Sequence, residues 1–146
     1  MTVFVDTNVL LYARDASEPV KQPRAQAWLD ALWELQRGRL SHQVLNEYYV
    51  AATRKLRPGL DRESARADVR DLMAWRPVGI DGALLEDAWW LEARFSLSFW
   101  DALIVAGARA TGCRYLLTED LQHGQDLDGL AVVDPFALEP QDLLLS

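Results

Sequence analysis

Cysteine is scarce in this sequence and long apolar runs are missing, and each absence excludes a class of protein. The only cysteine, Cys113, can form no internal disulfide and cannot build a cysteine-based zinc site. No stretch approaches the roughly 18 consecutive apolar residues of a membrane-spanning helix. The first residues also lack the basic start and apolar stretch of a secretory signal. We therefore expect a soluble, cytoplasmic protein with no membrane partner.

Lysine and arginine are absent from residues 118–146, while the rest of the chain holds acids and bases in equal number. The formal net charge of −7 therefore comes from this last segment alone. A negative balance argues against a generally basic nucleic-acid-binding protein. Any basic surface for a polyanion must then be local.

The length and composition are those of one folded domain. The chain has 146 residues, of which 50% are hydrophobic and 25% charged, far from the composition of disordered proteins. A chain of this size forms a single core and leaves no room for a second domain. We predict one domain over residues 1–146.

Short apolar segments alternate with helical patterns along the chain. Because the short segments are continuously apolar, they predict a parallel sheet covered by helices on both faces, an α/β fold. In such sheets ligands bind beyond the carboxyl ends of the strands. The predicted strands are residues 2–5, 77–80, 114–117 and 130–133, with a further short segment around residues 39–40.

Residues that cap helices mark where the helices begin. Ser41, Asp61 and Asp81 each precede a helical pattern and are predicted N-caps. The segment from Asp101 to Thr111 is almost wholly apolar, which predicts a helix buried on most of its faces.

Four carboxylates lie where the sequence offers them no basic partner. Asp6 closes the first strand, and no lysine or arginine lies within four residues of it. Glu47 has Val44, Val50 and Ala51 at i−3, i+3 and i+4 on its helix, where a surface glutamate would often face a basic residue. Asp101 opens the apolar helix, and Asp120 follows a strand in the segment without basic residues. Burying such groups is costly unless they are paired, hydrogen-bonded or bound to a metal.

Each of these acids also has a simpler explanation. Asp6 and Asp101 are possible helix caps, Glu47 a residue at the edge of a helix face, and Asp120 part of a turn. Their combination favours a site, because a parallel fold gathers strand ends at one edge. Converging carboxylates repel one another unless a hard divalent cation such as Mg²⁺ or Mn²⁺ holds them.

Four motifs occur in the order typical of one family. They are Val5–Asn8 after the first strand, Glu47 in the helix that follows Ser41, Asp101–Ile104 opening the apolar helix, and Leu117–Leu121. In these motifs, and in its ending through Phe136, the chain resembles the PIN-domain ribonucleases. It is most similar to the toxin halves of VapBC-type toxin–antitoxin pairs.

The resemblance implies a fold, a site and partners. It implies a PIN-like three-layer α/β/α sandwich with a five-stranded parallel sheet, a homodimer, and a cognate VapB-type antitoxin that covers the site. It implies that Asn8 and Thr118 support the site and leaves open whether Glu119 or Asp126 joins it. The residues that it implies as catalytic and as ligands of Mg²⁺ or Mn²⁺ are Asp6, Glu47, Asp101 and Asp120.

The chemistry of the residues agrees with a metal-dependent endoribonuclease. Hydrolysis of an RNA phosphodiester needs a polarised water, an in-line approach and stabilised oxyanions, which carboxylates with a metal supply. Neither His42 nor His123 is needed as a base, and both fit capping or surface roles. A DNA-directed nuclease remains an alternative, because this chemistry does not depend on the sugar.

Two other functions fit less well. A phosphoaspartyl phosphatase requires a second aspartate where this chain has Asn8, and a lysine later than Lys55. A catalytically inactive PIN-fold interaction module is expected to lack one or more of the four acids, and none is missing.

Basic and aromatic residues indicate where partners bind. Arg62, Arg66 and Arg70 recur every four residues in a locally basic segment, so they form either a track for RNA phosphates or a solvated helix face. Six tryptophans are many for one small domain. We expect most of them in the core and at least one at a partner interface.

Overall fold

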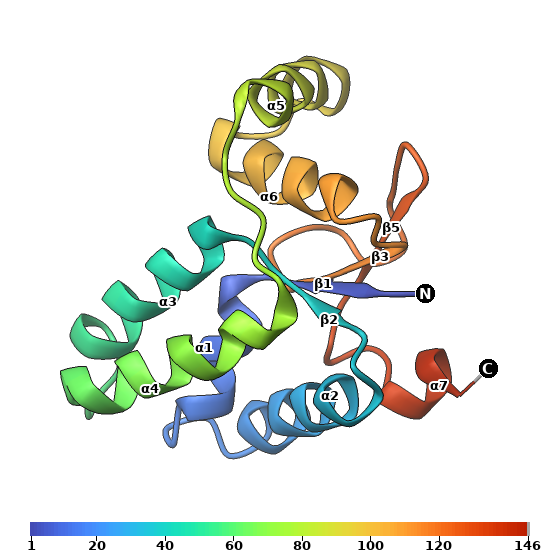
Figure 1. Ribbon diagram of the computed structural model, residues 1–146. Helices are drawn as coiled ribbons and strands as arrows, with labels where there is room; N and C mark the ends of the chain where they lie inside the picture. Colours follow the sequence, from blue (N-terminus) through green and yellow to red (C-terminus); the bar gives the residue numbers. More distant parts are fainter. Residues whose placement is uncertain (146) are drawn as a thin grey trace.

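The computed structural model describes residues 1–145 and has an α/β architecture (Figure 1). Its elements in chain order are β1 (Val3–Val5), α1 (Thr7–Arg14), α2 (Lys21–Leu35), β2 (Gly38–Arg39), α3 (His42–Arg54), α4 (Arg62–Leu72), the 3-10 helix η1 (Met73–Trp75), α5 (Gly82–Phe95), α6 (Phe99–Ala110), β3 (Tyr115–Leu117), β4 (Asp126–Leu127), β5 (Leu130–Val133) and α7 (Pro140–Leu144).

The sheet has five strands in the order β2-β1-β3-β5-β4. The first four are parallel, as expected, but the edge strand β4 pairs antiparallel with β5. Asp128 and Gly129 join these two strands with φ angles of 57° and 93°. An Asp-Gly pair with both φ angles positive is a strong hairpin signal. The expectation of a wholly parallel sheet is therefore corrected at this edge.

The strand predicted over residues 77–80 is reduced to a single bridge between Ser41 and Val78. Val78 donates to the Leu40 carbonyl at 3.2 Å, and His42 donates to the Val78 carbonyl at 3.0 Å. Pro77 has no backbone N–H, so it cannot extend this pairing.

Helices cover both faces of the sheet (Figure 1). In that view α6 lies above the strands with α5 outside it, while α2 and α7 lie below. All three residues of β1 are fully buried, and seven consecutive residues of α6 are buried as well, as expected for a core helix. A Cβ atom on Gly107 of α6 would lie only 3.3 Å from the Phe4 ring, so α6 packs closely on β1. No helix within residues 1–145 is both long and apolar enough to cross a membrane.

The helix starts follow the predicted caps with one exception. The side chains of Ser41, Asp61 and Asp81 each accept a hydrogen bond from a backbone N–H in the first turn of α3, α4 and α5. Helix α6 begins earlier than predicted, because Ser98 is its cap and accepts from the backbone N–H of Asp101 at 3.1 Å. Asp101 therefore lies in the first turn and is not the cap.

The carboxyl ends of β1 and β3 lie side by side. Val5 is paired with Leu117, and the Asp6 backbone N–H donates to the Leu117 carbonyl at 3.1 Å. The residues that follow each strand, Asp6 and Thr118, are thereby brought together. Helix α3 packs against α1 at the same edge of the sheet (Figure 1).

Candidate active site

Asp6, Asn8, Thr118 and Asp120 form one hydrogen-bonded cluster at this edge. The Thr118 hydroxyl donates to Asp6 Oδ2 at 2.8 Å. The side-chain amide of Asn8 lies 3.0 Å from Thr118 Oγ1, 3.2 Å from Asp120 Oδ2 and 3.3 Å from Asp6 Oδ2. Asn8 and Thr118 therefore hold two of the four predicted acids at fixed positions.

Asp6 is both a helix cap and a buried acid. Its Oδ1 accepts from the Thr7 backbone N–H at 2.7 Å at the start of α1, and the residue is only 6% exposed. Burial raises the pKa of Asp6 to about 7, even though hydrogen bonds from Thr118 and Thr7 lower it. The neighbouring charges of Asp120 and Glu47 raise the pKa further. The cap explanation is thus correct for Asp6 but incomplete.

Glu47 faces the cluster from α3. One of its carboxylate oxygens accepts from the Thr7 hydroxyl at 3.0 Å, and the other from Gln43 Nε2 at 2.8 Å. Gln43 also donates to the Trp100 carbonyl at 3.4 Å, which links α3 to the start of α6. This chain of contacts positions Glu47 beside the residue that follows β1.

Asp101 reaches the site from α6. Its carboxylate has no hydrogen bond or ion pair within residues 1–145. Partial burial raises the pKa of Asp120, the Asn8 amide lowers it, and the charge of Asp101 raises it again. Asp101 and Asp120 are therefore close enough to repel each other.

Glu119 and Asp126, whose membership the sequence leaves open, lie outside the cluster. Glu119 accepts from Lys21 at 3.0 Å and from the Tyr12 hydroxyl, so its charge is already paired. Asp126 is exposed and accepts from the Gly129 backbone N–H at 2.7 Å in the β4–β5 turn. None of the four predicted acids, in contrast, forms an ion pair with a described lysine or arginine.

The oxygen donors of the four acids suit a hard divalent cation, but their carboxylates do not form a preassembled metal-binding site. All four acids offer oxygen donors, which Mg²⁺ and Mn²⁺ prefer. Among residues 1–145, no three histidine, cysteine, aspartate or glutamate side chains already form a metal-holding group. Asp6 is turned toward Thr118, and Glu47 toward Thr7 and Gln43. Hydrogen bonds from protein donors thus already occupy part of the carboxylates of Asp6 and Glu47.

The sequence prediction missed three residues that the fold brings to the acids. Thr7 and Gln43 hold Glu47, and Lys55 lines the same hollow of 590 Å³ as Glu47 and Asp120. A signal was present in the spacing, because Gln43 and Lys55 lie one and two turns from Glu47 on one face of a helix.

The arginines of α4 differ in their surroundings. Arg70 forms an exposed ion pair with Glu63 at 2.9 Å. The Arg66 guanidinium lies over the Tyr49 ring, 5.9 Å from its centroid, and Arg62 has no described side-chain partner. Arg66 and Arg70 line one hollow between α3 and α4, so these two share a face beside α3.

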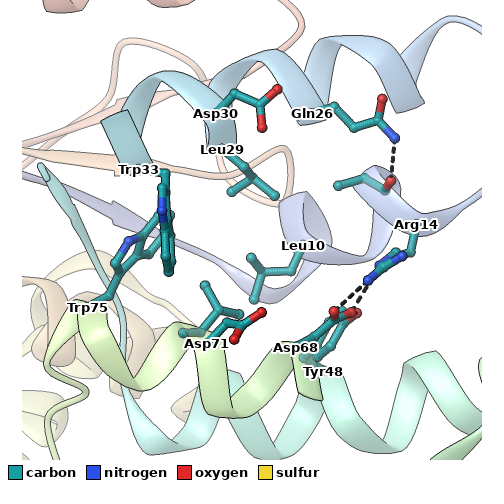
Figure 2. A pocket seen from close by; sticks show the side chains of 12 residues that line it. Leu10, Arg14, Gln26, Leu29, Asp30, Trp33, Tyr48, Asp68, Asp71 and Trp75 are labelled. Atoms are coloured by element: carbon teal, nitrogen blue, oxygen red, sulfur yellow. Dashed lines mark hydrogen bonds and ion pairs between the residues drawn. The ribbon is translucent and has the colours of Figure 1, made fainter. Parts of the chain in front are cut away.

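The expectation that most of the six tryptophans lie in the core is wrong. Only Trp28 and Trp75 are buried, while the other four are each exposed by nearly half or more. Trp33 packs against Trp75 with ring centroids 5.8 Å apart, at one end of a groove of 430 Å³ between α1, α2, α4 and η1. Figure 2 shows this groove, which does not include any of the four acids. The exposed tryptophans are Trp33, Trp89, Trp90 and Trp100.

Comparison with known proteins identifies the family to which this fold belongs. The sequence matches the PIN domain over residues 3–125. The geometry defines an α/β domain with acids at the carboxyl edge of its sheet. The chain belongs to the PIN domain family. Comparison with curated proteins gave no match.

Solved structures of toxin–antitoxin systems share the fold. VapC20 of Mycobacterium tuberculosis, described as a sarcin–ricin loop cleaving toxin, is 25% identical with a TM-score of 0.60 over 79% of this chain and 87% of that one. A toxin–antitoxin complex from Klebsiella pneumoniae is 20% identical with a TM-score of 0.65, covering 92% and 98%. FitAB bound to a DNA fragment is 22% identical with a TM-score of 0.70, covering 94% and 98%. The resemblance to VapC-type PIN domains is thereby confirmed.

Proposed function

We propose that this protein is a metal-dependent endoribonuclease and the toxin half of a type II toxin–antitoxin pair. The observation that carries the proposal is the gathering of Asp6, Glu47, Asp101 and Asp120 at one sheet edge without a basic partner. Four acids at such a site repel one another at neutral pH, and a divalent cation relieves that repulsion. Membership of the PIN domain family supports the same activity.

In this proposal each residue has a distinct task. Bound Mg²⁺ or Mn²⁺ supplies a polarised water and stabilises the oxyanions of phosphodiester hydrolysis. Asp6, Asp101 and Asp120 hold the cation, and Glu47 from α3 completes the ligand set or orients the attacking water. Asn8 and Thr118 fix Asp6 and Asp120 through the hydrogen bonds described above. Thr7 and Gln43 do the same for Glu47.

RNA is the substrate that the comparisons favour, because VapC20 is described as cleaving the sarcin–ricin loop and is 25% identical to this chain. A DNA-directed nuclease remains the second candidate, since the hydrolytic chemistry does not depend on the sugar. Neither candidate depends on a histidine, and His123 lies away from the acids, accepting from the Asp134 backbone N–H at 3.1 Å.

The partner in this proposal is a VapB-type antitoxin, as the toxin–antitoxin complexes among the structural neighbours suggest. The groove of Figure 2 suits an apolar segment with basic residues, because Leu29 and Trp33 line it beside Asp30 and Asp71, which have no described ion pair. The half-exposed Trp89 and Trp90 on α5 suit a homodimer contact. We place the pair in the cytoplasm, where its RNA would be.

The test is cleavage of matched single-stranded RNA and DNA by the purified protein. We expect the RNA to be cut in Mg²⁺ or Mn²⁺, cleavage to stop in EDTA, and excess Mg²⁺ to restore it. Asp120→Asn should abolish cleavage, whereas Asp126→Asn, which changes an acid outside the cluster, should leave it intact. Cleavage that continues undiminished in EDTA would refute the metal assignment, and cleavage of DNA alone would favour the second candidate.

A further inference from the structure

Glu47 lies midway along a trough that follows α3 and is made of two adjoining hollows. Two hollows adjoin Glu47, one of 590 Å³ toward Lys55 and one of 550 Å³ toward Trp100. Asp120 lines the first hollow, and Asn46 and Glu47 line both, so the two hollows adjoin along α3. From Gln43 to Lys55 helix α3 rises by about 18 Å, at 1.5 Å per residue. The trough is therefore long enough to hold more than the reacting phosphate.

One end of the trough is aromatic. Trp100 is 65% exposed, more than any other tryptophan of the chain, and Ile80 beside it is 51% exposed. The Trp100 ring packs edge-on against Phe99 with centroids 5.4 Å apart, and its carbonyl accepts from Gln43. The indole is thus held in place directly before Asp101, with most of its surface open to a flat ligand.

The other end is cationic. The Lys55 ammonium has no hydrogen bond or ion pair within residues 1–145 and is the only basic group that lines the hollow containing Glu47 and Asp120. Lys21, the other lysine, is already paired with Glu119. A free cation beside uncompensated acids suits an anionic ligand that passes the site and continues beyond it.

We propose that this trough binds single-stranded RNA, with a base next to the cut stacked on Trp100 and a backbone phosphate on the other side held by Lys55. This inference rests on the proposed function. Stacking on an exposed aromatic together with a phosphate contact is the way proteins bind single strands. A protein segment would use the apolar end but would leave Lys55 beside the acids without a phosphate to bind. In this arrangement the strand follows α3, with Trp100 on one side of Glu47 and Lys55 on the other.

The stacking contact is tested with a short end-labelled RNA and a series of copies, each with one abasic nucleotide near the mapped cut. In the parent, removing the stacked base should lower kcat/KM about 5- to 150-fold, the range expected for one base on an aromatic ring. In Trp100→Ala the same abasic copy should be cut as fast as the intact strand. Trp100→Phe should retain part of the difference, which excludes simple misfolding.

Val20→Ala is the control, because Val20 is 72% exposed and lies before α2, outside the trough. It should keep the full penalty for the missing base. The stacking role is overturned if Trp100→Ala keeps that penalty, or if Trp100→Ala changes only the oligomeric state seen by light scattering, which would make Trp100 a contact with a second copy.

The phosphate contact is tested by the salt dependence of kcat/KM. Lys55→Gln should reduce the log–log salt slope by about one unit and Lys55→Arg should restore it, as expected when one side chain neutralises a single phosphate. Arg94→Gln, an exposed charge on α5, should leave the slope unchanged. An unchanged slope in Lys55→Gln would overturn this half of the inference. If the parent cuts no RNA, the proposed function itself fails; if it cuts RNA with no role for Trp100 or Lys55, only the trough assignment fails.

Discussion

In the proposed function, Asp6 has two roles, helix cap and metal ligand, and in the metal-free protein its burial conflicts with the charge that the second role needs. As the cap of α1 it must accept from the Thr7 backbone N–H, and as a ligand it must keep its charge although it is only 6% exposed. Thr118 and Asn8 reduce the cost of that charge, and Asp120 and Glu47 increase it. The sequence predicted the acid and its cap position, but not its burial, because the residues around it come from β3, α3 and the segment after β3.

The first prediction is a pH-dependent stability set by Asp6. Its pKa is raised from 3.8 to about 7 in the folded state, so between these values the native protein holds a proton that the unfolded chain has lost. Stability should therefore fall as pH rises from about 4 to 7 in EDTA, by about 1.4 kcal/mol for each unit of pKa difference. Asp6→Asn keeps the cap and should remove most of this fall, as measured by chemical denaturation across the pH range.

The second prediction separates the charge of Asp101 from any capping role. Ser98 is the cap, so Asp101→Asn loses no capping bond but removes the repulsion on Asp120. The variant should melt a few degrees above the parent in EDTA, where about 1 kcal/mol corresponds to roughly 3 °C in a domain of this size. Millimolar Mg²⁺ should raise the melting temperature of the parent much more than that of the variant.

A variant no more stable than the parent in EDTA, and stabilised equally by Mg²⁺, would remove Asp101 from the metal site. Melting curves of both proteins in the two buffers are sufficient to decide.

At the scale of elements, local signals predicted most of the fold. The caps at Ser41, Asp61 and Asp81 and the buried helix α6 follow directly from residue type and spacing. The segment at residues 77–80 was overestimated, because its pairing is limited by Pro77 and depends on the neighbouring chain at Ser41. The β4–β5 hairpin was missed although the Asp128–Gly129 pair signals it. Which tryptophans are exposed depends on tertiary packing and has no local signal.

The third prediction concerns the close packing of β2 on η1. A Cβ atom at Gly38 would lie 2.7 Å from three carbons of the Trp75 ring, which is buried and cannot easily move. Gly38→Ala should destabilise the protein by about 1–3 kcal/mol, as overpacking does. Gly79→Ala is the matched control, because a Cβ there meets nothing within 4 Å. Equal urea midpoints for the two variants would contradict this packing.

The fourth prediction tests the arginine face of α4. Replacing Arg62, Arg66 and Arg70 with glutamine should weaken RNA binding and reduce the log–log salt slope by up to about one unit for each phosphate that no longer meets an arginine. Arg70 should contribute least, because Glu63 already pairs with it. The double change Arg94→Gln and Arg114→Gln serves as the control, because both residues are exposed, Arg94 on α5 and Arg114 in the segment before β3. If the salt slope of the triple variant equals that of the parent, the three arginines form a solvated helix face and do not bind RNA.

At the scale of the whole molecule, the fold separates two surfaces with different chemistry. The parallel strands β1 and β3 deliver Asp6, Thr118 and Asp120 to one edge, and α3 and α6 bring Glu47 and Asp101 to it. The groove of Figure 2 lies elsewhere, between α1, α2, α4 and η1, and contains none of the four acids. A substrate and an apolar partner segment would therefore contact separate surfaces, although helices α1 and α3 contribute residues to each of the two surfaces.

The positions of Asp6 and Asp120 at strand ends were sufficient to predict that these two acids meet, because a parallel sheet fixes where strand ends lie. Glu47 and Asp101 lie on helices, and it was the family resemblance that implied their place in the site. The supporting residues of the four acids were predictable only in part. Asn8 and Thr118 belong to the same motifs as the acids, whereas Gln43 and Lys55 become relevant only once α3 is placed against α1. The present orientation of the carboxylates, which form no finished cage within residues 1–145, could not be deduced from the sequence at all.

In the proposed function, Asp6, Glu47, Asp101 and Asp120 together form one catalytic metal site. The most direct measurement is calorimetric titration of the metal-free protein with Mn²⁺, for the parent and for the amide variant of each acid. The parent should bind, Asp126→Asn should bind equally well, and each of the four variants should bind at least about tenfold more weakly, the scale on which even supporting residues affect metal sites. Four variants that bind Mn²⁺ as tightly as the parent would contradict the claim.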